Sequence, residues 1–149
     1  MPMIDVYSAP GTFTDKQGLA QTLAATLMEI EQVPDIPMFR SNTAAFVHEL
    51  PGGAISNVDG AGDYVRVQVL TNAGALDRGK QLAVVERFTA IVAQAAGDAS
   101  LADRTWVLLT EAVPGGWGLG GHANTNDELI AAARKQIAKL QAEATGPTT

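Results

Sequence analysis

The chain has 149 residues, 46% of them hydrophobic and 17% charged, which is typical of one globular domain. No apolar run approaches the roughly 18 residues of a membrane helix, and no basic segment precedes an apolar one, so we expect a cytoplasmic protein without membrane span or secretory signal. A net charge of −6 argues against nucleic acid as a partner, and zero cysteines with two distant histidines, His48 and His122, argue against disulfides and a metal site.

The first seven residues combine a proline with an extended apolar run, Met1 to Tyr7. Aminopeptidases normally remove Met1 before so small a residue, which would leave Pro2 as the first residue. Its secondary amine would be held by the strand that begins there, as a base or nucleophile that needs no Cys, Ser or Lys. A retained Met1 would instead leave Pro2 in an amide.

A shift of 63 residues superimposes the landmarks of two halves of the chain. The coincident positions are Val6 and Val69, Gly11 and Gly74, Leu19-Ala20 and Leu82-Ala83, Asp35 and Asp98, and Pro51-Gly52-Gly53 and Pro114-Gly115-Gly116. Within one domain, 1–149, we therefore expect two units at 2–58 and 64–121, a linker at 57–63, and a C-terminal segment at 122–149.

The first half predicts a strand at 4–8, a helix, and a strand at 44–47. Thr14, with Gln17 three residues later, fits a capping box. Pro34 and Pro37 mark the exit from the helix. The apolar stripe of this helix recurs at helical spacing: Leu19, Leu23, Leu27 and Ile30.

The second half predicts strands at 64–70 and 105–110, with a helix capped by Asp77 between them. Its expected stripe is Leu82, Val85, Phe88 and Val92. The Gly-Gly pairs at 52–53 and 115–116 are interpreted as hairpin turns. A third helix, starting at Thr125 or Asn126 and ended by Gly146-Pro147, carries the stripe Leu129, Ile130, Ala133, Ile137 and Leu140.

Two strand–helix–strand units with long connections are typical of parallel, right-handed βαβ units. We therefore predict an α/β fold in which two fused βαβ repeats form a four-stranded sheet with helices on one face, plus a C-terminal helix. The other face would be bare and apolar, which a soluble monomer rarely tolerates. The pattern thus predicts an oligomer.

The run TWVLLTEAVPGGWGLGG, Thr105 to Gly121, closely resembles the closing strand and hairpin of the 4-oxalocrotonate tautomerases, which also begin Met-Pro. Six single βαβ units assemble in that family. Two fused units resemble instead the tautomerase-superfamily branch of cis-3-chloroacrylic acid dehalogenase, whose members are trimers. Over residues 2–121, the resemblance implies a homotrimer without cofactor that acts on a small carbonyl compound or unsaturated acid.

The resemblance also implies that Pro2 is the catalytic base, and acid–base chemistry explains why an amino-terminal proline suits this role. An α-amino group has a pKa of about 7.7–8.0. Burial and nearby cations disfavour the ammonium form, so the amine is a free base near neutrality. A secondary amine also forms iminium and enamine species with aldehydes.

By the same resemblance, Trp117 matches an aromatic residue that walls the pocket, although packing of the hairpin is an equally good explanation. The substrate-binding arginine on the closing strand aligns with Trp106, and with Thr43 in the first half. The helix histidine of the dehalogenase aligns with Glu29. At the arginine position, filled by Trp106 and Thr43, and at the histidine position, filled by Glu29, this chain therefore differs from the family pattern.

The dehalogenase holds its substrate carboxylate with two arginines, near which this chain has Asn72 and Ala75. Its water-activating glutamate aligns with Leu119. This chain thus lacks the two carboxylate-binding arginines but keeps Pro2 as the base, which predicts poor dehalogenation. Arg40 is a candidate for binding an anionic substrate in a neighbouring subunit, or else a solvated loop charge, and Arg66 is expected to point away from its valine neighbours.

The sequence thus predicts a cofactor-independent tautomerase or isomerase that uses Pro2 for proton transfer. Its other candidate site residues are Trp117, Trp106, Asn72, Arg40 and Glu29. Two alternatives stay open: a lyase or hydratase acting by dehalogenase-like, aldol or Michael-type chemistry through a Pro2 iminium, and a non-catalytic protein of the same fold.

Overall fold

The computed structural model describes residues 1–146 and contains two βαβ units in succession. The first comprises β1 (Met3–Ser8), α1 (Lys16–Glu31) and β2 (Ala44–Glu49), and the second β3 (Val65–Thr71), α3 (Arg78–Ala96) and β4 (Thr105–Glu111). A short helix precedes each closing strand: α2 (Pro37–Ser41) and the 3-10 helix η1 (Ala99–Arg104). The chain continues through β5 (Trp117–Leu119), β6 (His122–Asn124) and α4 (Asn126–Ala144).

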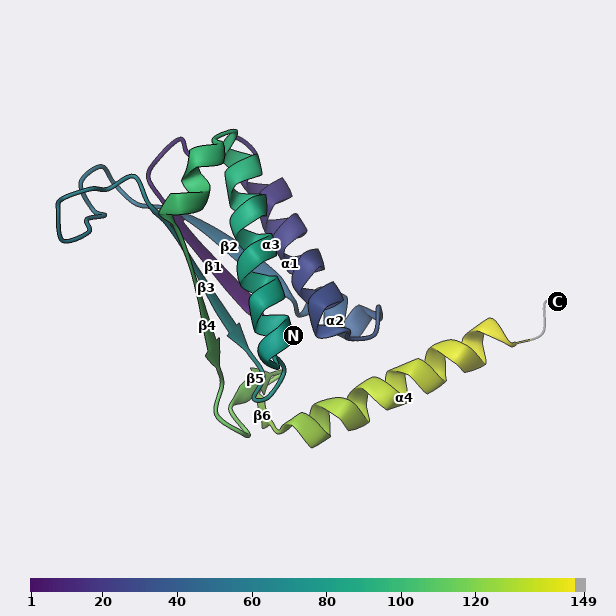
Figure 1. The fold of residues 1–149 in the computed structure, drawn as a ribbon. Helices are drawn as coiled ribbons and strands as arrows, with labels where there is room; N and C mark the ends of the chain where they lie inside the picture. Colours follow the sequence, from purple (N-terminus) through teal and green to yellow (C-terminus); the bar gives the residue numbers. More distant parts are fainter. Residues whose placement is uncertain (147–149) are drawn as a thin grey trace.

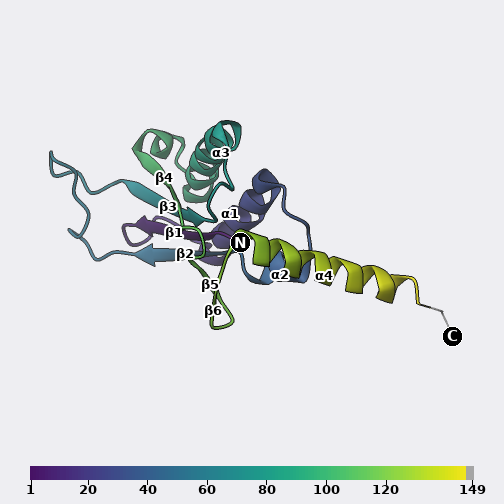
Figure 2. The ribbon, with the colours of Figure 1, turned by 90° about the horizontal axis from the view of Figure 1, so that it is seen from below.

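The four main strands form one sheet in the order β2-β1-β3-β4. Each unit contributes a parallel pair, and β1 and β3 run antiparallel at the centre, with Ile4 opposite Val69. The two units are therefore related by an approximate twofold axis. Helices α1 and α3 cover the same face of the sheet (Figures 1 and 2). The predicted α/β fold of two fused βαβ repeats is confirmed.

The core lies between the sheet and these two helices. Its fully buried side chains include Ile4, Val6, Leu23, Leu27, Val67, Val69, Val84, Phe88 and Val92. On α3 the buried stripe is Val84, Phe88 and Val92, at intervals of four residues. The prediction was right for Phe88 and Val92 but wrong for Leu82 and Val85, whose side chains are 53% and 39% exposed because they fall beside this stripe.

The helix starts follow local capping chemistry. Asp15 caps α1 by accepting a hydrogen bond from the Gly18 N–H at 2.8 Å, so the predicted capping box at Thr14 is wrong. Asp77 caps α3, as predicted. Thr125 caps α4 in a capping box with Glu128. Helix α4 ends at Ala144, and the predicted stop residue Pro147 lies outside the described residues.

The repeat extends to the breaks after the first strand of each unit. The Gly11 N–H donates to the Glu49 carboxylate at 3.2 Å, and the Gly74 N–H donates to the Glu111 carboxylate at 3.0 Å. Both glycines have positive φ, 76° and 72°, a conformation that favours glycine at these positions. In each unit, the loop after the first strand is thus hydrogen-bonded to the last residue of the second strand.

The hairpin that follows β4 is formed by β5 and β6, with Leu119 opposite His122. Its two-residue turn is Gly120-Gly121, in which both residues have positive φ. The predicted hairpin turn at Gly115-Gly116 is instead part of the connection between β4 and β5, and Gly52-Gly53 lies in the loop between β2 and β3.

The open face of the sheet is more polar than expected. Phe46, Leu70, Trp106 and Leu108 are 39–50% exposed on it. Between them, His48 lies 2.6 Å from the Asp5 carboxylate and stacks on Tyr7. The Arg66 guanidinium lies 5.5 Å from the centre of the Tyr7 ring, pointing away from its valine neighbours as predicted. Aromatic and apolar patches therefore flank a charged centre.

Helix α4 projects away from the sheet and its covering helices (Figure 1). Of its predicted stripe, Leu129 and Ala133 are buried, while Ile130 and Leu140 are 48% and 38% exposed. The Met38 N–H donates to the Gln136 side chain at 2.8 Å, which ties the middle of α4 to α2. None of the helices in residues 1–146 has both the length and the apolar character needed to cross a membrane.

Candidate active site

The amino terminus lies where β1 begins and β3 ends. Met1 is only 2% exposed, and its side chain packs against the buried Trp117 and Leu129. Pro2 is also buried, and its carbonyl oxygen accepts a hydrogen bond from the Ala44 N–H at 3.3 Å. Partly buried residues complete this cluster: Met3, Met38, Phe39, Ala112 and Leu119. The start of the chain is thus part of a small apolar core of its own.

Polar groups surround the terminal amine. The Met1 nitrogen donates to the Asn72 side-chain oxygen at 3.4 Å and lies 4.0 Å from the Glu31 carboxylate. Burial lowers the pKa of the Met1 amino group, while the charge of Glu31 acts in the opposite direction. The amine therefore loses its proton more readily than an exposed one.

Glu31 is a buried carboxyl group at the last position of α1, 8% exposed. The Thr71 hydroxyl donates to one of its oxygens, and the Lys80 ammonium donates to its backbone carbonyl at 3.3 Å. Burial raises the pKa of Glu31; the Thr71 hydrogen bond, the terminal amine and Lys80 act against this. Burial thus favours the uncharged form of both the carboxyl group and the amine.

A cavity of about 330 Å³ opens onto these groups, within the size range of small-molecule sites. Its polar lining comes from Glu31, Asn72, Lys80 and Asn126, and its apolar lining includes Met1, Phe39, Leu129 and Ile130. A mostly apolar wall with a few convergent polar groups is typical of a binding site. The residues come from the amino terminus, α1, α2, α3, α4 and the loop after β3.

The residues singled out from the sequence fall into two groups. Pro2, Asn72 and Trp117 lie together around the buried amino terminus. Trp106 lies at the other end of the sheet, where it stacks on Tyr64 with 4.5 Å between ring centres.

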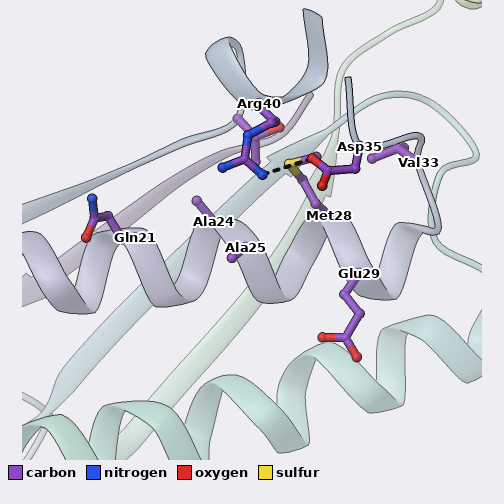
Figure 3. Close-up of a pocket in the computed structure, with 9 residues that line it drawn as sticks. Gln21, Ala24, Ala25, Met28, Glu29, Val33, Asp35 and Arg40 are labelled. Atoms are coloured by element: carbon purple, nitrogen blue, oxygen red, sulfur yellow. Dashed lines mark hydrogen bonds and ion pairs between the residues drawn. The ribbon is translucent and has the colours of Figure 1, made fainter. Parts of the chain in front are cut away.

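Glu29 and Arg40 line a second, larger cavity of about 600 Å³ between α1 and the segment around α2 (Figure 3). There Arg40 pairs with Asp35 at 2.9 Å, while Glu29 is directed towards α3 and pairs with Arg87 at 3.0 Å.

Sequence reasoning missed Glu31 and Lys80, although both continue a buried stripe. Glu31 follows Leu19, Leu23 and Leu27 at intervals of four residues. Lys80 precedes Val84, Phe88 and Val92 at the same interval. A titratable residue at the end of an apolar stripe is therefore the signal that would have identified them.

The approximate twofold axis creates a related cavity of about 290 Å³ at the opposite end of the sheet. Ala9, Gly11 and Thr12 line it, in the repeat positions of Asn72, Gly74 and Ala75. In place of an amino terminus, the continuous chain passes through Tyr64-Val65. Arg104 occupies this side in ion pairs with Asp63 and Asp98. Of these two repeat-related cavities, the one lined by Met1 contains a chain terminus.

Within residues 1–146, no three His, Asp or Glu side chains gather in the way that metal ligands do. The polar groups around Met1 are an amine, a carboxyl group, two amides and an ammonium group. Amines and carboxyl groups transfer protons. The chemistry available at this cavity is therefore proton transfer, or covalent catalysis by an amine.

The chain matches no family model and no curated protein sequence. Solved structures do match. A wild-type fused 4-OT (4-oxalocrotonate tautomerase), described as a symmetric trimer, has a TM-score of 0.70 at 15% identity, with 85% of this chain and 98% of that chain covered. N1, a member of the cis-3-chloroacrylic acid dehalogenase family, has a TM-score of 0.68 at 16% identity and coverages of 95% and 99%.

A macrophage migration inhibitory factor-like protein from Entamoeba histolytica has a TM-score of 0.63 at 21% identity, with 81% of this chain and 96% of that chain covered. At such identities the likeness concerns the fold. The chain has the fold of the fused 4-OT proteins and of other proteins of the tautomerase superfamily.

Proposed function

We propose that this protein is a cofactor-independent tautomerase or isomerase in which the amine of Pro2, freed by removal of Met1, moves a proton on a small carbonyl or unsaturated compound. The observation that supports this most directly is the burial of the amino terminus in a cavity with a carboxyl group and Asn72. A free amine at this place has both a binding cavity and a shifted pKa.

Removal of Met1 would empty the space that its side chain fills against Trp117 and Leu129. Pro2 is itself buried, so the same desolvation would lower the pKa of its amine. A lowered pKa increases the fraction of the amine that is present as the free base, which general-base catalysis requires. In this proposal Trp117 walls the apolar end of the substrate site, and Asn72 lies at its polar end.

Two other functions remain alternatives. A secondary amine also forms an iminium ion with an aldehyde, which would support lyase chemistry. The close fit of Met1, with its amine beside Glu31 and Asn72, favours instead a non-catalytic protein that retains Met1. The presence or absence of Met1 distinguishes the two proposed catalytic functions from the non-catalytic one.

The test compares two preparations that intact mass shows to contain or lack Met1. Each is incubated with a small aldehyde and borohydride, and the adduct is located by peptide mapping. We expect the form without Met1 to carry the label on Pro2 and to catalyse exchange of α-protons of a small ketone in D₂O, as followed by NMR.

The form with Met1 is the matched control and is expected to be inactive, because its Pro2 nitrogen is an amide. Equal exchange rates for the two forms, or label confined to lysines, would refute the proposed role of Pro2.

A further inference from the structure

We propose that Glu31 is a second catalytic residue, which exchanges a proton with the carbonyl oxygen of the substrate while Pro2 exchanges one with the adjacent carbon. We further infer that the substrates are neutral, enolisable aldehydes or ketones with an apolar substituent. This inference rests on the proposed function of Pro2 and assigns the other half of the same reaction.

The position of Glu31 is the first argument. It occupies the stripe of α1 on which Leu19, Leu23 and Leu27 are buried, so an apolar residue would serve packing better. An unpaired buried carboxylate is strongly disfavoured, and this carboxyl group faces a cavity and a chain terminus instead of a full ion pair. The Thr71 hydroxyl holds one of its oxygens in place.

Met1 supplies the second argument, because it occupies the space that a substrate would fill. Its nitrogen lies 4.0 Å from the Glu31 carboxylate. The backbone atoms N, Cα and C of Met1 form the covalent path from that position to the nitrogen of Pro2. This is a three-atom unit, like the O=C–C unit of an enolisable carbonyl compound. A compound placed there has its oxygen towards Glu31 and its α-carbon towards Pro2, and its substituent follows the Met1 side chain towards Trp117 and Leu129.

The proposed reaction needs no further reactant, because one group accepts a proton and the other donates one. In the enolisation direction, the neutral Pro2 amine removes a proton from the α-carbon as the C–H bond breaks. The protonated Glu31 carboxyl group gives its proton to the oxygen as the O–H bond forms. The resulting ammonium and carboxylate return to the neutral pair when the proton passes from Pro2 to Glu31, and ketonisation is the reverse.

The electrostatic surroundings favour the forms of the two groups that this step requires. The charged groups facing Glu31 are the terminal amine, which precedes β1, and Lys80 from α3. Burial raises the pKa of the Glu31 carboxyl group and lowers that of the Met1 amine, so it favours the neutral acid beside the neutral base.

The lining also indicates the class of substrate. A carboxylate is best held by the two-pronged contact that arginine makes, and no arginine is among the described residues that line this cavity. Within residues 1–146, the one basic side chain that lines it is Lys80, whose ammonium donates a hydrogen bond to the carbonyl oxygen of Glu31. The remaining polar groups are the two amides Asn72 and Asn126, which suit a neutral oxygen.

The test follows exchange of the α-protons of 4-phenylbutan-2-one in D₂O by NMR, with protein from which Met1 has been removed. We expect Glu31→Gln to lower kcat by about 10²–10⁴-fold with little change in KM, as for the loss of a general acid. The alkaline limb of the pH–rate profile should also disappear, because that limb reports ionisation of Glu31. Glu31→Asp should recover part of the rate.

Glu86→Gln is the control: it removes an exposed carboxylate from α3 that lines none of the three cavities described above, and it should leave the rate unchanged. Thr71→Val provides a second test if Glu31→Gln fails to fold. Since the Thr71 hydrogen bond lowers the pKa of Glu31, its loss should move the alkaline limb to higher pH.

A wild-type rate and pH profile in Glu31→Gln, or an unmoved alkaline limb in Thr71→Val, would overturn the role of Glu31 and leave that of Pro2 intact. If protein with and without Met1 exchanges the protons equally well, the proposed function itself fails. For substrate class, 2-oxo-4-phenylbutanoate should show a higher KM than the neutral ketone. A lower KM for this carboxylate would overturn that assignment.

Discussion

Two series of single residues, spaced four apart, determine both the core and the candidate site. The series on α1 is Leu19, Leu23, Leu27 and Glu31, and the series on α3 is Lys80, Val84, Phe88 and Val92. Their apolar members are buried between the helices and the sheet. Their titratable members lie at the same end of the sheet, where the amino terminus also lies. One helical periodicity thus positions both the core residues and two residues of the candidate site.

At this scale, Phe88→Ala is expected to lower the free energy of unfolding by about 3–5 kcal/mol, because the fully buried ring would leave a cavity. Urea denaturation at fixed protein concentration measures this, since assembly contributes to apparent stability. Leu82→Ala on the same helix is the control, with a much smaller loss expected for a side chain that is 53% exposed. Equal losses would mean that the buried stripe of α3 is misassigned.

At the scale of the elements, each long helix begins at a side chain that accepts a backbone N–H. Asp15 does this for α1, Asp77 for α3 and Thr125 for α4. These caps fix where each helix starts. Helix α1 ends at Glu31, the fourth member of its stripe, because Gln32 adopts the left-handed C-cap conformation, and this end of the helix lies beside the chain terminus.

We predict that Asp15→Ala destabilises the protein by about 0.5–2 kcal/mol, the usual effect of losing an N-cap acceptor. Thr14→Ala, one residue earlier, should change stability little, because Asp15 makes the capping hydrogen bond. Hydrogen exchange of the first turn of α1 reports the effect locally. A larger effect of Thr14→Ala would show that the capping box inferred from the sequence operates in solution.

At the scale of the molecule, the approximate twofold arrangement leaves one face of the sheet without helices (Figure 2). That face exposes Phe46, Trp106 and Leu108 around a polar centre in which His48 lies 2.6 Å from the Asp5 carboxylate. Exposed apolar side chains of this kind indicate a protein–protein contact. They support the oligomer that the sequence predicts, which the resemblance described in the sequence analysis implies to be a homotrimer.

Light scattering should therefore report three times the chain mass of 15.5 kDa at micromolar concentration. Leu108→Lys, which places a charge on the open face, should shift the population to smaller species. Leu82→Lys, on the exposed side of α3, is the control and should leave the mass unchanged. A wild-type monomer, or equal effects of the two lysines, would contradict assembly through the open face.

Much of this protein can be read from short stretches of its sequence. The strands, the α1 stripe, the caps Asp77 and Thr125, and the repeat with its Gly11 and Gly74 breaks follow from local chemistry: side-chain periodicity, turn glycines and hydrogen bonds within a few residues. Because two like units must share one sheet and one core, the fold class follows too.

Only the tertiary structure determines which residues lie together at the amino terminus. Glu31, Asn72 and Lys80 are separated from Met1 along the chain and converge there because β1 and β3 run antiparallel. That pairing sets the start of β1 beside the ends of β3 and β4. Trp106 is the second residue of β4, opposite Arg66, and therefore lies at the far end of the sheet. Strand direction and register, which no local pattern encodes, determine the composition of the site.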